Sequence, residues 1–160
     1  MALFRLERSH IDLKKSLIAI DSPPKNTDMT NPANEQIVKQ LFTSYLKGDL
    51  AGVIGLLDPS VVWLEPGAPD IPFAGTFTGL PDVEKMLGME AQLLKVTSFV
   101  PKAYFSNDNI VLVVGADSAN VPSTGKGYST DWTMEFTLAN GKIIRVQTFM
   151  DTNAIAKAFV

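Results

Sequence analysis

Aspartate and glutamate are the residues of this sequence best suited to acid–base chemistry. The 160-residue chain has no cysteine and one histidine, His10, in a peripheral N-terminal stretch. The lack of cysteine excludes disulfides, thiolate metal sites and a cysteine nucleophile. A histidine-rich metal site is not expected, and a Ser-His-Asp triad requires the N-terminal stretch to fold into the site. If the protein is catalytic, we expect it to need no metal and no redox cofactor.

Two carboxylates stand at the ends of predicted strands. Glu65 ends the apolar strand SVVWLE, immediately before Pro66, and Asp151 stands where the last strand meets the last helix. At the mouth of an apolar pocket, desolvation raises the pKa of a carboxyl group toward the range of a useful general base. If both residues face one cavity, their like charges raise one pKa further. The alternatives are a solvent-exposed glutamate at position 65 and a plain helix N-cap at position 151.

The composition is that of a globular protein with no preference for polyanions. Hydrophobic residues make up 46% of the chain, charged residues 19%, and the formal net charge is −3. Without a run of Lys or Arg, no nucleic-acid partner is expected. No segment reaches the ~18 consecutive apolar residues of a membrane span, and the N-terminus does not read as a secretory signal. We expect a cytoplasmic protein with no membrane partner.

The chain divides into an extension and one domain. Ser22 to Glu35 is rich in Pro, Asn, Asp and Thr, which favour turns and linkers. We therefore interpret residues 1–33 as an N-terminal extension and linker, and residues 34–160 as the domain. The extension is expected to pack on the domain or on a partner subunit, or to be partly disordered.

Apolar periodicity predicts helices followed by strands. Helices are expected over residues 34–47, 50–57, 81–94 and 152–159. Strands are expected over residues 60–65, 96–105, 109–118, 127–138 and 142–150. The stretch GAPDIPFAGTFTG is expected to form a long loop. This order predicts an α+β fold with helices on one face of a curved antiparallel sheet.

Two stretches resemble the SnoaL-like, ketosteroid-isomerase-like group of the nuclear-transport-factor-2-like superfamily. The opening of that family is similar to FTSYLKGDLAGVIGLLDPSVVWLEPGAPDIPFAGTFTG, and its last hairpin and helix are similar to TDWTMEFTLANGKIIRVQTFMDTNAIAKAF. The resemblance implies a cystatin-like cone, in which a curved antiparallel sheet wraps around the N-terminal helices and leaves an apolar cavity for a small hydrophobic molecule. The scaffold hosts isomerases, cyclases, hydrolases, dehydratases and binding proteins, so the resemblance does not name a reaction.

The resemblance also implies roles for single residues. Glu65 aligns with the catalytic base of the isomerases, and Asp151 stands where SnoaL-like cyclases commonly carry an acid–base aspartate. The oxyanion donors of the isomerases are not matched, since their tyrosine aligns with Leu41 and their protonated acid with Trp132. Tyr45 or the indole N–H of Trp132 is the candidate replacement donor. Because one such donor contributes about 3–4 kcal/mol, ketosteroid isomerase activity itself is not expected.

The remaining candidates for the cavity wall are mainly apolar. They are Trp63, Phe73, Phe77, Met134 and Phe149, with Gln147 as a polar neighbour on the last strand. The alternative for most of them is simple core packing. Asp131 alternates to the face opposite Trp132 and is expected to be exposed or to lie in an interface.

Two function hypotheses follow. The first is cofactor-free acid–base isomerisation or cyclisation of a hydrophobic carbonyl compound, with Glu65 or Asp151 moving the proton and Trp132 or Tyr45 holding the oxygen. The second is a non-catalytic module for hydrophobic-ligand binding or dimerisation. A homodimer is expected in either case, because curved sheets of this superfamily often pair face to face.

Overall fold

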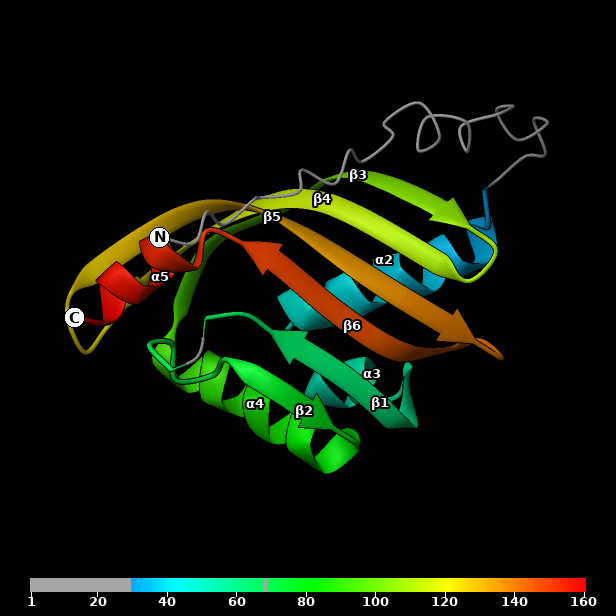
Figure 1. Cartoon of the computed structure of the whole chain (residues 1–160), viewed down its shortest axis with the longest axis horizontal. Coiled ribbons are helices and arrows are strands. Elements are labelled where there is room, and N and C mark those ends of the chain that lie inside the picture. Colours follow the sequence, from blue (N-terminus) through cyan, green and yellow to red (C-terminus); the bar gives the residue numbers. More distant parts are fainter. Residues whose placement is uncertain (1–29, 68) are drawn as a thin grey trace, which may run out of the picture.

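The computed structural model describes residues 30–67 and 69–160. Within these residues the architecture is α+β, with helices gathered on one side of a single curved, six-stranded sheet (Figure 1). The expected extension over residues 1–33 therefore falls, except for its last four positions, outside the described residues.

The described helices and strands follow the expected order. The helices are α2 (Pro32–Leu46), α3 (Leu50–Ile54), α4 (Leu80–Leu93) and α5 (Thr152–Phe159). The strands are β1 (Leu57–Glu65), β2 (Gly75–Thr78), β3 (Lys95–Asn107), β4 (Ile110–Val121), β5 (Lys126–Ala139) and β6 (Lys142–Met150). No helix among these residues is long and apolar enough to cross a membrane.

The sheet has the strand order β2-β1-β6-β5-β4-β3. Its neighbours are antiparallel except for β1 and β6, which run parallel, so the expected antiparallel sheet is mixed at one position. Two strands joined by a tight turn must run antiparallel. Because most of the domain lies between β1 and β6 in the sequence, no such turn joins them and they can pair in parallel. Register shifts in three of the pairings accompany the bending of the sheet.

Two local predictions are wrong. The second helix ends at Ile54 rather than at Leu57, because Leu57 already pairs with Ile143 of β6 as the first residue of β1. Part of the expected long loop is a strand, since Gly75–Thr78 pairs antiparallel with the end of β1 as an edge strand. In both places, pairing with a strand that is distant in the sequence determines the structure, and the local residue pattern does not.

The first described helix and the last hairpin have the cap and the turn that their residues favour. The Asn31 side chain accepts a hydrogen bond from the Asn34 N–H at 3.2 Å, with Pro32 in the first turn of α2. The hairpin between β5 and β6 turns at Asn140 and Gly141, whose φ values of 52° and 74° are the positive values that such a turn requires.

The apolar core is divided into two clusters. The larger packs α2, α3 and α4 against the concave face of the sheet, around Val38, Val61 and Phe136. The smaller packs α5 over the chain after β1 and the far ends of β4 and β5, around Phe73, Val121 and Ile155. Met150 contacts both clusters, and the candidate site lies between them.

Candidate functional site

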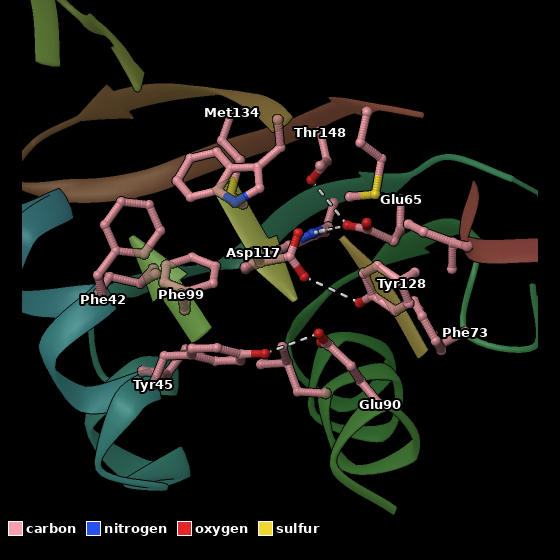
Figure 2. Close-up of a pocket in the computed structure, with 17 residues that line it drawn as sticks. Phe42, Tyr45, Glu65, Phe73, Glu90, Phe99, Asp117, Tyr128, Met134 and Thr148 are labelled. Atoms are coloured by element: carbon pink, nitrogen blue, oxygen red, sulfur yellow. Dashed lines mark hydrogen bonds between the residues drawn. The ribbon is translucent and has the colours of Figure 1, made fainter. Parts of the chain in front are cut away.

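A cavity lies on the concave side of the sheet, with walls from all four described helices, from five strands and from the chain after β1 (Figure 2). The volume of the cavity is about 70 Å³. This is room for several waters or for a compact organic group. Its apolar wall includes five of the expected residues, namely Leu41, Trp63, Phe73, Trp132 and Met134. Its polar wall consists of Tyr45, Glu65, Glu90, Asp117, Tyr128 and Thr148.

Glu65 lies in the cavity wall and is held there by two donors. Trp63, two residues earlier on the same face of β1, donates its indole N–H to Glu65 Oε2 at 3.2 Å, and the Thr148 hydroxyl donates to the same oxygen at 2.9 Å. No hydrogen bond from a described residue reaches Oε1. Burial, together with the nearby carboxyl group of Glu90, raises the pKa of Glu65 to about 8, against the opposing effect of the two hydrogen bonds.

A second carboxyl group, Glu90, comes from α4. Tyr45 on α2 donates its hydroxyl proton to Glu90 Oε1 at 2.9 Å, as Figure 2 shows. Burial raises the pKa of Glu90 to about 7, although the hydrogen bond from Tyr45 acts in the opposite direction. Burial beside this carboxyl group also raises the pKa of Tyr45, so its hydroxyl stays protonated at neutral pH.

A third carboxyl group, Asp117, comes from β4. Tyr128 on β5 donates its hydroxyl proton to Asp117 Oδ2 at 3.1 Å. Burial raises the pKa of Asp117 above its ordinary value, against the effect of this hydrogen bond. The second oxygen, Oδ1, is buried and has no hydrogen-bond partner among the described residues.

The three carboxyl groups share an electrostatic environment. Charge on Glu90 or Asp117 raises the pKa of Glu65, and charge on Asp117 raises the pKa of Glu90. The described residues of the wall include no Lys, Arg or His to balance them. Like charges in a poorly solvated space disfavour simultaneous ionisation, so the cavity retains protons near neutral pH.

Trp132 is fixed against this polar wall by aromatic contacts. Its ring stacks on Phe99, with centroids 5.0 Å apart and planes 24° from parallel, and Phe42 contacts it at 5.9 Å. Gly115 lies opposite it on β4, where a Cβ atom would stand 2.2 Å from the indole. The indole Nε1 is buried and has no hydrogen-bond partner among the described residues.

Asp151 lies outside the cavity wall. Its side chain is exposed and caps α5, accepting hydrogen bonds from the backbone N–H groups of Asn153 and Ala154 at 3.1 and 3.2 Å. Glu65 and Asp151 therefore do not face one cavity, and the carboxylate pair considered for that case is not formed. The cap geometry holds Asp151 at the helix start, and Glu90 and Asp117 take its place beside Glu65.

Three other expected lining residues also lie elsewhere. Phe149 alternates with the inward-facing Thr148 and Met150, so it points to the outer face of the sheet and is 48% exposed. Gln147 shares that outward register and accepts a hydrogen bond from Arg145 Nη2 at 2.7 Å. Phe77 pairs with Trp63 across β1 and β2 and packs on the larger core cluster outside the cavity wall.

Asp131 is exposed, which was one of its two expected placements. It forms an ion pair with Lys102, at 2.6 Å between Oδ1 and Nζ. No cluster of His, Asp or Glu in the described part of the chain is arranged to hold a metal ion.

The sequence contained signals for the four polar residues that the prediction missed. Glu90 is spaced three and four residues after the buried Leu87 and Met86, which places it on the inner face of α4. Asp117 continues the alternation of buried residues along β4, and Tyr128 and Thr148 fall in the inward registers of β5 and β6. A charged residue in a buried register marks a candidate for a functional site, and the opposite walls of the cavity decide whether it is one.

Comparison with known proteins supports the same fold and family. The sequence model of the SnoaL-like domain matches residues 38–146. An uncharacterised protein of Mycobacterium tuberculosis is 26% identical over 131 residues, covering 82% of this chain and 98% of its own. The crystal structure of a nuclear-transport-factor-2-like protein of Burkholderia xenovorans superposes with a TM-score of 0.75 at 28% identity, covering 82% of this chain and 99% of its own. TerC, co-crystallised with polyporic acid, superposes with a TM-score of 0.71 at 19% identity, covering 79% and 98%.

Proposed function

The chain belongs to the SnoaL-like domain family, and we propose that it is a cofactor-independent acid–base enzyme that isomerises or cyclises a small hydrophobic carbonyl compound. The observation that carries this proposal is that Glu65 is buried in the cavity wall, with one carboxyl oxygen held by hydrogen bonds and with a raised pKa. Two donors fix its Oε2, no described residue bonds its Oε1, and its pKa of about 8 suits a general base near neutral pH.

The proposed chemistry begins with proton abstraction. The ionised Glu65 takes a proton from the carbon next to the carbonyl group, the C–H bond breaks, and its electron pair enters the enolate. The protonated Glu65 then returns the proton to a different carbon, which completes an isomerisation. Alternatively, the enolate carbon attacks a second carbonyl group in the same molecule, which closes a ring, and the protonated Glu65 gives its proton to the alkoxide that this attack forms. Neither route needs an oxidant or a co-substrate.

The oxygen of the enolate needs a hydrogen-bond donor, and the cavity wall offers two. The N–H of Trp132 has no partner among the described residues and lies in the wall with Glu65. When Glu90, whose pKa is about 7, is protonated, it can donate its own proton to the Tyr45 oxygen, and the Tyr45 hydroxyl proton is then free to turn toward the enolate. Donors that are fixed before the reaction stabilise developing charge most effectively. The crystal of TerC with polyporic acid supports the use of this fold for small organic ligands.

Hydrogen–deuterium exchange of a simple ketone tests the base assignment. In D₂O with cyclohexanone as the probe, the wild-type protein is expected to accelerate exchange at the carbons next to the carbonyl. Glu65→Gln is expected to reduce that acceleration at least about 100-fold, since a positioned base contributes 10²–10⁴-fold. Glu84→Gln, at an exposed glutamate of α4, is the matched control and should leave it unchanged. Equal acceleration by the wild type and Glu65→Gln would show that Glu65 is not the base.

The second candidate function is non-catalytic ligand binding. One observation favours it: the two tyrosine hydroxyls of the cavity already donate to carboxyl groups, and an indole N–H cannot transfer a proton at neutral pH. A lack of exchange above the buffer rate, together with a lipophilic molecule retained in a native mass spectrum, would favour this candidate over the enzyme.

We also propose a cytoplasmic homodimer that pairs through the outer face of the sheet. Val100, Phe105 and Phe149 expose about half of their surface there, at 49%, 57% and 48%. Exposed apolar side chains of this size on one face are typical of an interface. Light scattering of the purified protein should give a mass of two chains, and a monomer would contradict the proposal.

A further inference from the structure

Two buried polar atoms of the cavity are unsatisfied. Among the described residues, Asp117 Oδ1 and Trp132 Nε1 are the only buried side-chain oxygen or nitrogen atoms without a hydrogen-bond partner. Leaving such an atom unpaired costs about 1–3 kcal/mol, and Trp132 is only 4% exposed, so bulk water does not relieve it. One atom is a donor and the other is an acceptor. A pair of this kind in a cavity wall indicates a ligand group that offers the opposite pattern.

The strand register places the two side chains next to each other. Trp132 on β5 lies directly opposite Gly115 on β4, and Asp117 is two residues further along β4 on the same face. Diagonal neighbours in an antiparallel pair are near enough for long side chains to reach a common point. Both residues belong to the cavity wall.

Both side chains are held in place by other residues. Tyr128 bonds the second oxygen of Asp117, which leaves Oδ1 as the free acceptor. Phe99 stacks on the indole of Trp132, and Gly115 provides the space beneath it. A donor and an acceptor that are fixed in this way recognise a ligand without losing much conformational entropy on binding.

The charges of the cavity restrict the ligand class. Three carboxyl groups without a basic residue in the described wall disfavour carboxylate and phosphate groups. An ammonium group would suit Asp117, but it has no lone pair to accept from Trp132. A carbonyl group alone would accept from Trp132, but it has no proton to donate to Asp117 Oδ1. A hydroxyl group both accepts and donates, so it satisfies the two atoms together.

We propose that Trp132 Nε1 and Asp117 Oδ1 form a subsite for the neutral hydroxyl group of an enol or a phenol, whose apolar part lies against the remaining wall of the cavity. The inference rests on the proposed function, because an enol is the hydroxyl form of the carbonyl compound on which Glu65 would act. It adds the substrate class, an enolisable or phenolic ring compound, and it makes Asp117 a residue that determines specificity.

The test uses four small probes with one aromatic ring: phenol, toluene, benzylamine and benzoate. The chain has two tryptophans, so a ¹⁵N-labelled sample gives two indole N–H signals, and Trp132→Phe identifies that of Trp132. Phenol is expected to bind about tenfold more tightly than toluene, as one to two net hydrogen bonds would give, and to shift the Trp132 signal downfield. Benzylamine and benzoate are expected to bind more weakly than phenol.

Variants separate the two atoms. Trp132→Phe keeps the stacked ring and removes the donor. Asp117→Asn replaces the free acceptor with an NH2 donor, because the Tyr128 hydroxyl holds the amide oxygen. Each is expected to reduce the preference for phenol over toluene to about twofold or less. Asp131→Asn, at an exposed aspartate beside Trp132, is the matched control and should keep the full preference. The comparison of probes on the wild-type protein remains decisive if a variant does not fold.

Several results would overturn the subsite. These are equal binding of phenol and toluene to the wild type, tighter binding of benzylamine than of phenol, and a preference for phenol that persists in both variants. If the chain shows Glu65-dependent exchange of cyclohexanone without a preference for phenol, the subsite is wrong and the proposed function stands. If it prefers phenol but does not exchange, the subsite stands as part of a binding protein.

Discussion

Replacement of Glu65 by glutamine should change how the stability of the protein depends on pH. The folded protein raises the pKa of Glu65 from 4.5 to about 8. Below pH 4.5 the group is protonated in both the folded and the unfolded chain, and folding carries no ionisation cost. As the pH rises toward 8, the unfolded chain releases this proton and the folded chain retains it, so the free energy of unfolding falls. Glutamine cannot ionise and is free of this loss.

The size of the effect follows from the shift. A displacement of 3.5 pKa units, from 4.5 to 8, at 1.36 kcal/mol per unit corresponds to about 5 kcal/mol over the whole titration. Between pH 5 and pH 9, part of the titration lies outside the window, and about 4 kcal/mol is expected. Since the stability of a domain is of the order of 5–15 kcal/mol, a difference of this size is readily measured.

Urea unfolding at pH 5 and pH 9 is the appropriate assay. The wild type is expected to lose about 4 kcal/mol more than Glu65→Gln between the two conditions. Glu84→Gln serves as the control because Glu84 is exposed on α4, and it should follow the wild type. If the wild type and Glu65→Gln lose stability in parallel, Glu65 ionises as it does in water, and the reasoning from its burial is refuted.

Three further substitutions test other parts of the site. Thr148→Val removes a hydrogen bond that lowers the pKa of Glu65, so the midpoint of the pH–rate profile for cyclohexanone exchange should move to higher pH, and an unchanged or lower midpoint would contradict the assignment. Gly115→Ala places a Cβ atom in the space of the Trp132 indole and should cost about 1–3 kcal/mol in urea unfolding, with a changed tryptophan fluorescence; a neutral result would mean that the indole has room to move. Asp151→Ala removes the cap of α5 and should cost about 0.5–2 kcal/mol in the same assay while leaving the exchange rate unchanged, so a large loss of rate would restore Asp151 to the catalytic site.

The fold was predictable to a large extent because local signals and tertiary structure agree along most of the chain. The strand Lys142–Met150 and the helix Thr152–Phe159 are as predicted, since alternation, a turn at Asn140–Gly141 and an aspartate cap all mark them. The strand at Gly75–Thr78 was missed because four residues in a stretch rich in Gly and Pro have no periodicity of their own. Only their pairing with β1 makes them a strand.

The site was predictable in part. The resemblance drew attention to Glu65, and the structure places it in the cavity wall with Trp63 and Trp132. Asp151 was chosen because it stands at the junction of a strand and a helix, where the need for a cap is satisfied by the same residue type. Glu90 and Asp117 carry no motif, and an acidic residue in a buried register becomes meaningful only when the opposite walls of the cavity are known.

The central claim is that a carboxyl group at Glu65 ionises near neutral pH inside the cavity. Carbon NMR of the protein labelled with ¹³C at the glutamate carboxyl groups measures this directly, with Glu65→Gln to assign the signal. The structure predicts a midpoint of about 8 for Glu65. A midpoint close to the ordinary glutamate value of 4.5 would contradict the claim, and with it the role of Glu65 as the base.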